Sequence, residues 1–133
     1  MKFDGDPNLK RAVTAVTMVL REYMARMDGQ DPEKALELLE PDFRFLITLP
    51  GGERTGTSKA DFAAYIAGRN AVDRVHDIVR YSVDQDLETA YGFVVEAGAT
   101  MGAFLSAAVV SPSGLMARYQ SFFTPVFHLV DRP

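Results

Sequence analysis

Residues 74–84, which read RVHDIVRYSVD, mark the point at which the sequence changes from a helical to a strand period. Branched and aromatic residues alternate here with polar ones, a pattern typical of a strand with two unlike faces. One face would carry His76, Ile78, Arg80 and Ser82, and the other Val75, Val79, Tyr81 and Val83. We therefore expect an extended strand whose more polar face includes a histidine.

Three further strands are expected downstream, at residues 89–99, 102–111 and 115–127. Turns would lie at residues 84–86, 100–102 and 111–114, where Asp, Gly, Pro and Ser gather. Strands that follow one another closely favour an antiparallel meander. Several of them are apolar on both faces, which predicts that one face packs on helices and the other on a second copy of the chain.

The region upstream is mostly helical in pattern. A long first helix is expected from Asp6-Pro7, an N-cap followed by proline, to Asp28-Gly29. Its apolar stripe consists of Leu9, Val13, Val16, Leu20, Met24 and Met27. A short second helix would begin at Asp31-Pro32 and stop at Pro41.

Phe43, Phe45, Ile47 and Leu49 then alternate with less apolar residues, so we expect a strand at residues 42–49 with an aromatic inner face. A turn at residues 50–52 and a short return strand at 53–56 would follow. Ser58 and Asp61 fit the capping pattern that begins a third helix, which would end at Gly68.

These elements predict an α+β fold in the order α-α-β-β-α-β-β-β-β. Three N-terminal helices would pack against a strongly curved antiparallel sheet, giving a cone that encloses a pocket. Glycines 92, 98 and 102 are candidates for the kinks that curve the strands. The 133 residues form one expected domain, 1–133.

Composition excludes several classes of function. The net charge is −4 and the basic residues are scattered, so nucleic acid is not an expected partner. The chain has no cysteine and only two histidines, far apart, which argues against disulfides and metal sites. No apolar stretch approaches the ~20 residues of a membrane span, and residues 1–10 lack a signal-peptide pattern, so a cytoplasmic protein is expected.

Three segments carry a resemblance to a known family. They are residues 23–31 (YMARMDGQD) with Leu39 and Pro41-Asp42, residues 55–65, and residues 114–123 (GLMARYQSFF). In order and spacing they resemble the SnoaL-like and ketosteroid-isomerase-like branch of the nuclear transport factor 2-like superfamily. The resemblance implies a sheet wrapped around a long helix, a deep apolar pocket and usually a homodimer. Members cyclise polyketides, isomerise ketosteroids, dehydrate hydroxylated rings, or only bind a partner.

The resemblance also implies roles for individual residues. Tyr23 matches the family's phenol on the first helix, and Ser106 falls where a second hydrogen-bond donor would be. The first-strand carboxylate of ketosteroid isomerases is replaced by Ile47 or Leu49, neither of which can accept a proton. An acidic residue found near the end of the last strand in several relatives is Thr124 here.

His76 is the remaining candidate base, because a neutral imidazole is poised for proton transfer near neutral pH. The family's dehydratase branch similarly has a histidine on the strand after the third helix. If the polar face of residues 74–84 lines the pocket, His76 and Arg80 point at the ligand; if it faces solvent, both are surface residues. Asp77 and Glu96 are possible carboxylate partners for the histidine.

The expected site has Tyr23 and His76 as catalytic residues. The expected ligand-binding residues are Met27, Phe45, Ile47, Tyr65, Arg80, Ser106 and Tyr119. Neither a metal nor a cofactor is expected. Two functions stay open: acid/base catalysis of cyclisation, dehydration or isomerisation on a flat hydrophobic oxygenated molecule, and a non-catalytic module of the same fold that binds a ligand or a second protein.

Overall fold

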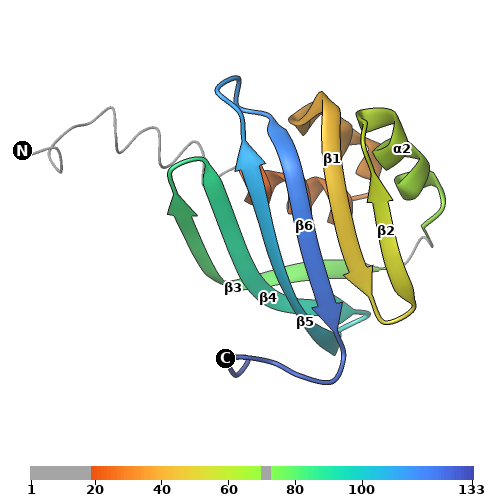
Figure 1. Cartoon of the computed structure of the whole chain (residues 1–133). Coiled ribbons are helices and arrows are strands. Elements are labelled where there is room, and N and C mark those ends of the chain that lie inside the picture. Colours follow the sequence, from red (N-terminus) through yellow and green to blue (C-terminus); the bar gives the residue numbers. More distant parts are fainter. Residues whose placement is uncertain (1–18, 70–72) are drawn as a thin grey trace, which may run out of the picture.

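A computed structural model describes residues 19–69 and 73–133. The expected start of the first helix, residues 6–18, lies outside the described residues; residues 19–28 are helical. The elements that follow are η2 (Pro32–Leu38), β1 (Leu39–Leu49), β2 (Gly52–Gly56), α2 (Lys59–Ala67), β3 (Arg74–Asp84), β4 (Leu87–Glu96), β5 (Ala99–Val110) and β6 (Met116–Thr124). Figure 1 shows the helices gathered on one side of a single sheet.

The sheet has six strands in the order β2-β1-β6-β5-β4-β3. The expected meander of β3 to β6 is confirmed, since each of these strands pairs antiparallel with the next. The expectation of an entirely antiparallel sheet is wrong at one place, because β1 runs parallel to β6. This pairing joins the first part of the chain to the last and places Phe45 beside Tyr119.

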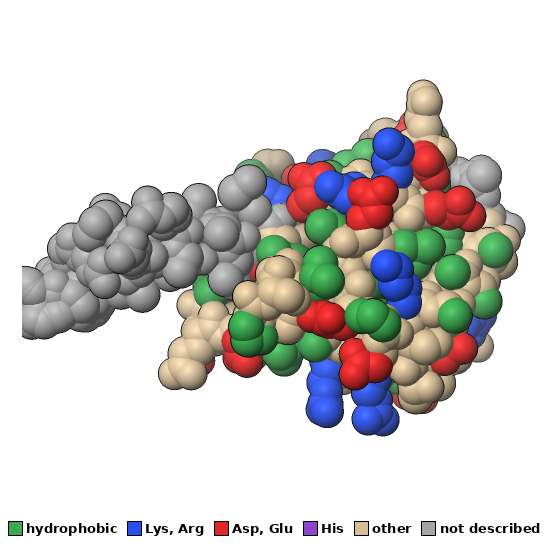
Figure 2. Space-filling view, turned by 90° about the horizontal axis from the view of Figure 1, so that it is seen from above, with side chains coloured by type: hydrophobic (Ala, Val, Ile, Leu, Met, Phe, Trp, Pro, Cys, Tyr) green, Lys and Arg blue, Asp and Glu red, His purple; other side chains and the backbone are tan. Residues whose placement is uncertain are grey.

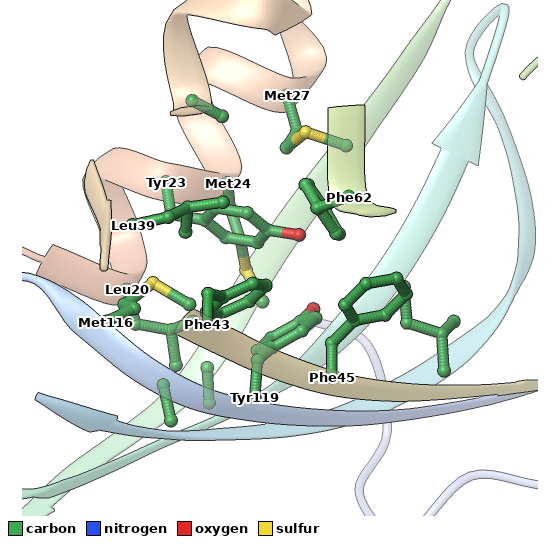
Figure 3. Packing of buried hydrophobic residues seen from close by; sticks show 14 of the residues in the cluster. Leu20, Tyr23, Met24, Met27, Leu39, Phe43, Phe45, Phe62, Met116 and Tyr119 are labelled. Atoms are coloured by element: carbon green, nitrogen blue, oxygen red, sulfur yellow. The ribbon is translucent and has the colours of Figure 1, made fainter. Parts of the chain in front are cut away.

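The core lies between the helices and the sheet. Leu20, Met24 and Met27 are all buried, which confirms the apolar stripe for the described part of the helix. Figure 3 shows the rings of Tyr23, Phe43, Phe45, Phe62 and Tyr119 packed together. Neighbouring rings meet at centroid distances of 4.9 Å for Phe45 and Phe62 and 5.5 Å for Phe43 and Phe62, both edge to face.

The second helix differs from its prediction. It is a 3₁₀ helix that ends at Leu38, and β1 begins at Leu39, so Pro41 lies inside the strand rather than before it. Residues 40–43 have no paired residue in β6, because the register shifts between Leu39 and Arg44. Proline is tolerated there since no ladder hydrogen bond is lost.

The turn expected at residues 100–102 is also misplaced. The chain reverses at Ala97 and Gly98, whose φ angles of 50° and 83° form a two-residue hairpin between Glu96 and Ala99. Two successive positive φ values match the right-handed twist of the flanking strands. Met101 instead lies at a β-bulge in β5, where the register against β4 shifts.

A second bulge interrupts β3. Ile78 pairs with Gly92 and Arg80 with Tyr91, which leaves Val79 as an extra residue. A bulge reverses the alternation of side chains, so the expectation that His76 and Arg80 share a face is wrong. The strands approach so closely here that a Cβ on Gly92 would lie 2.1 Å from the carbonyl oxygen of Asp77. β3 bends along its length in Figure 1.

The surface seen from above carries basic and acidic side chains intermixed, with hydrophobic ones between them (Figure 2). Among residues 19–69 and 73–133, no helix is long and apolar enough to span a lipid bilayer.

Candidate functional site

A cavity of about 910 Å³ lies between the helices and the sheet. Its buried end is formed by Tyr23, Phe45, Ile47, Val94, Phe104 and Tyr119. Charged residues line it as well: Glu53, Arg54, Asp61, Arg69, Arg74 and Glu96. Every helix and strand except η2 contributes to the lining. The site can therefore hold an apolar body while offering polar groups to its substituents.

Two tyrosines stand together at the buried end. Tyr23 comes from the helix of residues 19–28 and Tyr119 from β6, and their ring centroids lie 5.0 Å apart. Figure 3 shows both hydroxyl oxygens on the same side of the ring cluster. Burial raises the pKa of Tyr23 well above its ordinary value, and electrostatic interaction with Tyr119 raises it further. Burial likewise raises the pKa of Tyr119. Both phenols are protonated near neutral pH, so each has one O–H to donate.

Ser106 lies behind Tyr119 rather than in the cavity lining. Its Oγ accepts a hydrogen bond from the Tyr119 hydroxyl at 3.4 Å and lies 2.8 Å from Oγ of Ser121, its cross-strand partner in β6. The expectation that Ser106 donates directly to a ligand is therefore wrong, because the hydroxyl is occupied by these neighbours. Ser121, which sequence reasoning did not single out, lines the cavity.

His76 is held by a residue far away in the sequence. Its backbone N–H donates to Oδ2 of Asp28 at 2.7 Å, and its ring Nδ1 lies 2.7 Å from Oδ1 of the same carboxylate. The ring also packs edge-on against Phe104, with centroids 5.0 Å apart. The side chains of His76 and Asp28 are only 20% and 11% exposed. Because Asp28 occupies Nδ1, the nitrogen left for other chemistry is Nε2.

Asp28 is the candidate site residue that the sequence did not reveal. In the sequence, Asp28 marks the Asp28-Gly29 helix end and falls within the family-like segment 23–31, and nothing in the spacing connects it with His76. The carboxylates that seemed closer in sequence are engaged elsewhere. Asp77 pairs with Arg132 at 2.8 Å, and Glu96 pairs with Arg74 at 3.1 Å.

The other expected site residues divide into two groups. Met27, Phe45, Ile47 and Tyr65 line the cavity together with Tyr23, His76 and Tyr119. Arg80 does not: it is exposed, and its guanidinium donates to the carbonyl of Val79 at 3.2 Å. The bulge at Val79 is the reason, because it turns Arg80 away from the face that carries His76.

Within the described ranges, no group of three or more His, Cys, Asp or Glu residues could hold a metal ion. What the site does contain is a histidine in contact with a carboxylate, and two phenols, around one cavity. This arrangement can move a proton and stabilise negative charge on an oxygen.

No family model matches the sequence, and no curated protein matches it. Solved structures do. A proposed ketosteroid isomerase from Kribbella flavida DSM 17836 is 18% identical, with 90% of this chain and 85% of that chain covered and a TM-score of 0.70. A proposed isomerase of the SnoaL-like family from Agrobacterium tumefaciens str. C58 is 12% identical, with 84% and 98% covered and a TM-score of 0.69.

A proposed SnoaL-like polyketide cyclase from Jannaschia sp. CCS1 is 9% identical, with 83% of this chain and 85% of that chain covered and a TM-score of 0.68. Identities this low establish the fold and leave the activity open. The chain thus has the same fold as these structures, which are named as a ketosteroid isomerase, a SnoaL-like isomerase and a SnoaL-like polyketide cyclase.

Proposed function

We propose that this chain is a small-molecule-binding domain that carries out cofactor-independent acid/base chemistry on a flat, hydrophobic, oxygenated compound. His76 is the base, Asp28 orients it, and Tyr23 and Tyr119 donate hydrogen bonds to the substrate oxygen, for which Tyr119 gives up its long 3.4 Å bond to Ser106. The observation that carries the proposal is the 2.7 Å contact between Asp28 and His76 at a cavity that both tyrosines also line. The names of the structural neighbours, isomerase and cyclase, agree with this class of reaction.

The Asp28–His76 pair supports proton removal. A carboxylate that accepts from Nδ1–H fixes the tautomer with Nε2 unprotonated, and it stabilises the imidazolium formed when Nε2 takes a proton. The additional bond from the His76 backbone to Asp28 holds the carboxylate in place. Removing a proton next to a carbonyl leaves negative charge on the carbonyl oxygen, which then needs a donor.

The tyrosine pair supports stabilisation of that charge. Two neutral phenols in a buried setting interact more strongly with a developing oxyanion than they would in water, and they require no reorganisation during the reaction. The protons stay on the phenols because burial raises both pKa values.

In this proposal, β1 forms an apolar wall of the cavity and provides no acid or base. Ile47 and Leu49 both line the cavity, so the wall where ketosteroid isomerases carry a carboxylate is apolar here. The proposed base lies on β3 instead. Dehydration and cyclisation therefore fit the site better than isomerisation of the steroid type.

We extend the proposal to the whole chain: one domain of residues 1–133, cone-shaped around its pocket, cytoplasmic and homodimeric. The homodimer is supported by the outer sheet face, where Leu105 and Phe122 are cross-strand neighbours and are 43% and 49% exposed. Apolar side chains of this size in a row favour a protein partner.

Proton exchange tests the catalytic part without knowledge of the substrate. 2-Tetralone in D₂O exchanges the hydrogens next to its carbonyl, and NMR follows the loss of signal. We expect the protein to accelerate this exchange, and His76→Gln to reduce the acceleration by about 100-fold or more. Arg80→Gln, which changes an exposed side chain outside the cavity, is the control and should exchange like the wild type.

A second candidate function, non-catalytic ligand binding, is favoured by the apolar first strand and by Thr124. Thermal shift with 2-naphthol and 2-tetralone separates the two. Stabilisation by these compounds with exchange that is unchanged in His76→Gln would establish binding alone and overturn the catalytic proposal. Absence of both binding and exchange would contradict both functions and would favour a module that binds a second protein through the outer sheet face.

A further inference from the structure

Among the residues that the structure describes, one partly buried arginine at the cavity lacks the carboxylate partner that two others have. Three arginines of the described residues are partly buried: Arg26, Arg69 and Arg74. Arg26 pairs with Glu22 at 2.9 Å and Glu37 at 3.1 Å, and Arg74 pairs with Glu96 at 3.1 Å. Arg69 lies within 4.0 Å of no carboxylate of residues 19–69 and 73–133. It follows α2 directly and lines the cavity.

The contacts of Arg69 leave most of its hydrogen-bonding capacity unused. Its guanidinium donates to the Met27 sulfur at 3.9 Å and lies 5.9 Å from the centroid of the Tyr65 ring. A thioether is a weak acceptor, and a guanidinium has five N–H donors in a planar fork. A partly buried cation with so few partners is unfavourable unless something else satisfies it.

The positive charge of Arg69 acts on the cavity rather than on bulk solvent alone. It lowers the pKa of Tyr23, although burial outweighs this effect. Glu96 of the lining pairs with Arg74. Asp61, which accepts from the backbone N–H of Thr57 at 2.9 Å, and Glu53 also line the cavity, and neither lies within ion-pair distance of Arg69 in the described structure. Within residues 19–69 and 73–133, Arg69 is thus a partly buried cation of the lining with no carboxylate within 4.0 Å.

We propose that Arg69 binds a carboxylate of the ligand, so that the substrate class is a flat hydrophobic acid. This inference rests on the proposed function and specifies its substrate. The apolar body lies against Ile47 and Phe104, a ketone or phenol oxygen faces Tyr23 and Tyr119, and the carboxylate lies against the guanidinium fork of Arg69. The fork matches a carboxylate in a bidentate geometry that a neutral amide cannot reproduce.

A matched pair of ligands tests the inference. 6-Hydroxy-2-naphthoate and 6-hydroxy-2-naphthamide share shape and phenol and differ in charge. By titration calorimetry we expect the wild type to bind the acid about tenfold more tightly than the amide, because charge-assisted hydrogen bonds exceed neutral ones. Arg69→Gln should bring the ratio to about one and leave amide binding nearly unchanged. Arg80→Gln removes the same charge away from the cavity and should keep the preference.

Three other results would contradict the inference. Equal binding of acid and amide by the wild type would overturn the role of Arg69 and leave the proposed pocket intact. A preference for the acid that persists in Arg69→Gln, or is lost equally in Arg80→Gln, would show that general charge attraction is responsible. Binding of neither ligand by the wild type would overturn the proposed function and this inference with it.

Discussion

The cavity has two unlike walls. The β1 wall presents Phe45, Ile47 and Leu49, three residues in regular alternation that are apolar throughout. The β3 wall presents Arg74 and His76, followed by a bulge, and each polar group on it is held by a partner from elsewhere in the chain. The regularly alternating strand β1 provides packed apolar side chains. The polar side chains lie on β3, where a bulge interrupts the alternation. The predictions below test that contrast, from the largest expected effect to the smallest.

Truncation of the β1 wall should have the largest effect on stability. Phe45 is 4% exposed and packs against Phe43, Phe62 and Tyr65. Phe45→Ala should lower the free energy of unfolding by about 3–5 kcal/mol, measured by urea denaturation. His76→Ala should lower it by clearly less, because that ring is more exposed and has few packing neighbours. Equal losses would mean that the β3 wall is as much a part of the core as the β1 wall.

The bulge on β3 depends on the absence of a side chain opposite it. A Cβ at Gly92 would meet backbone atoms of Asp77 and Ile78, which no side-chain rotation can relieve. Gly92→Ala should therefore cost about 1–3 kcal/mol of stability. Gly51→Ala is the matched control, since nothing lies within 4 Å of a Cβ there. Indistinguishable denaturation curves for the two variants would show that β3 and β4 can separate at the bulge at little cost.

The orienting role of Asp28 should appear in catalysis more than in binding. Asp28→Asn keeps the shape and removes the charge, so the tautomer and the stabilisation of the imidazolium are lost. We expect the exchange rate of 2-tetralone to fall by about tenfold or more while its dissociation constant changes little. The pH profile of the exchange rate provides a second measurement, because a purely structural role would leave the shape of that profile unchanged. An unchanged rate would remove Asp28 from the proposed mechanism.

Beyond the bulge, β3 carries Tyr81, whose hydroxyl donates to Oε1 of Glu88 at 2.7 Å. Leu20 N–H donates to the same oxygen at 2.9 Å, and Oε2 has no hydrogen-bond partner within the described residues. Burial raises the pKa of Glu88 above its ordinary value. The carboxyl thus binds its proton more tightly in the folded state, and its contribution to stability is largest at low pH and is lost as pH rises through the folded-state pKa.

Glu88→Gln removes this titration and retains an oxygen for the two donors. We expect the smallest effect of the series here: the variant should gain stability relative to the wild type at pH 8, with the difference shrinking toward pH 4. Denaturant melts at several pH values measure it. A difference that is constant with pH would show that the carboxyl titrates alike in the folded and unfolded states.

Local patterns were sufficient where neighbouring residues decide the structure. The helix begun by Ser58, the strand of Phe45 and Ile47, and the meander from residue 74 onward all follow from periodicity and capping. Local patterns did not predict the places where a β-bulge adds an unpaired residue to a strand or where the chain turns back on itself. The bulge at Val79 and the turn at Ala97 leave no clear sign in hydrophobic alternation, so Arg80 was placed in the wrong direction.

The candidate site shows the same division. Tyr23, Met27 and Tyr65 belong to helical faces, and their inward direction follows from the spacing of apolar residues around them. Asp28 and Arg69 each lie at a helix end, where periodicity carries no information about direction. Their proposed roles depend on what they face in the folded chain: Asp28 contacts His76 on β3, and Arg69 lines the cavity.

The sequence by itself determined the class of fold and the apolar faces that the helices and β1 bury, because burial of a periodic hydrophobic pattern is a local property repeated along the chain. Tertiary structure alone decided the parallel pairing of β1 with β6, the contact of Asp28 with His76 across 48 positions, and the position of Arg69 at the cavity. These features depend on which surfaces meet once the sheet has closed upon its helices. Contacts between residues distant in sequence have no period, so only the folded chain reveals them.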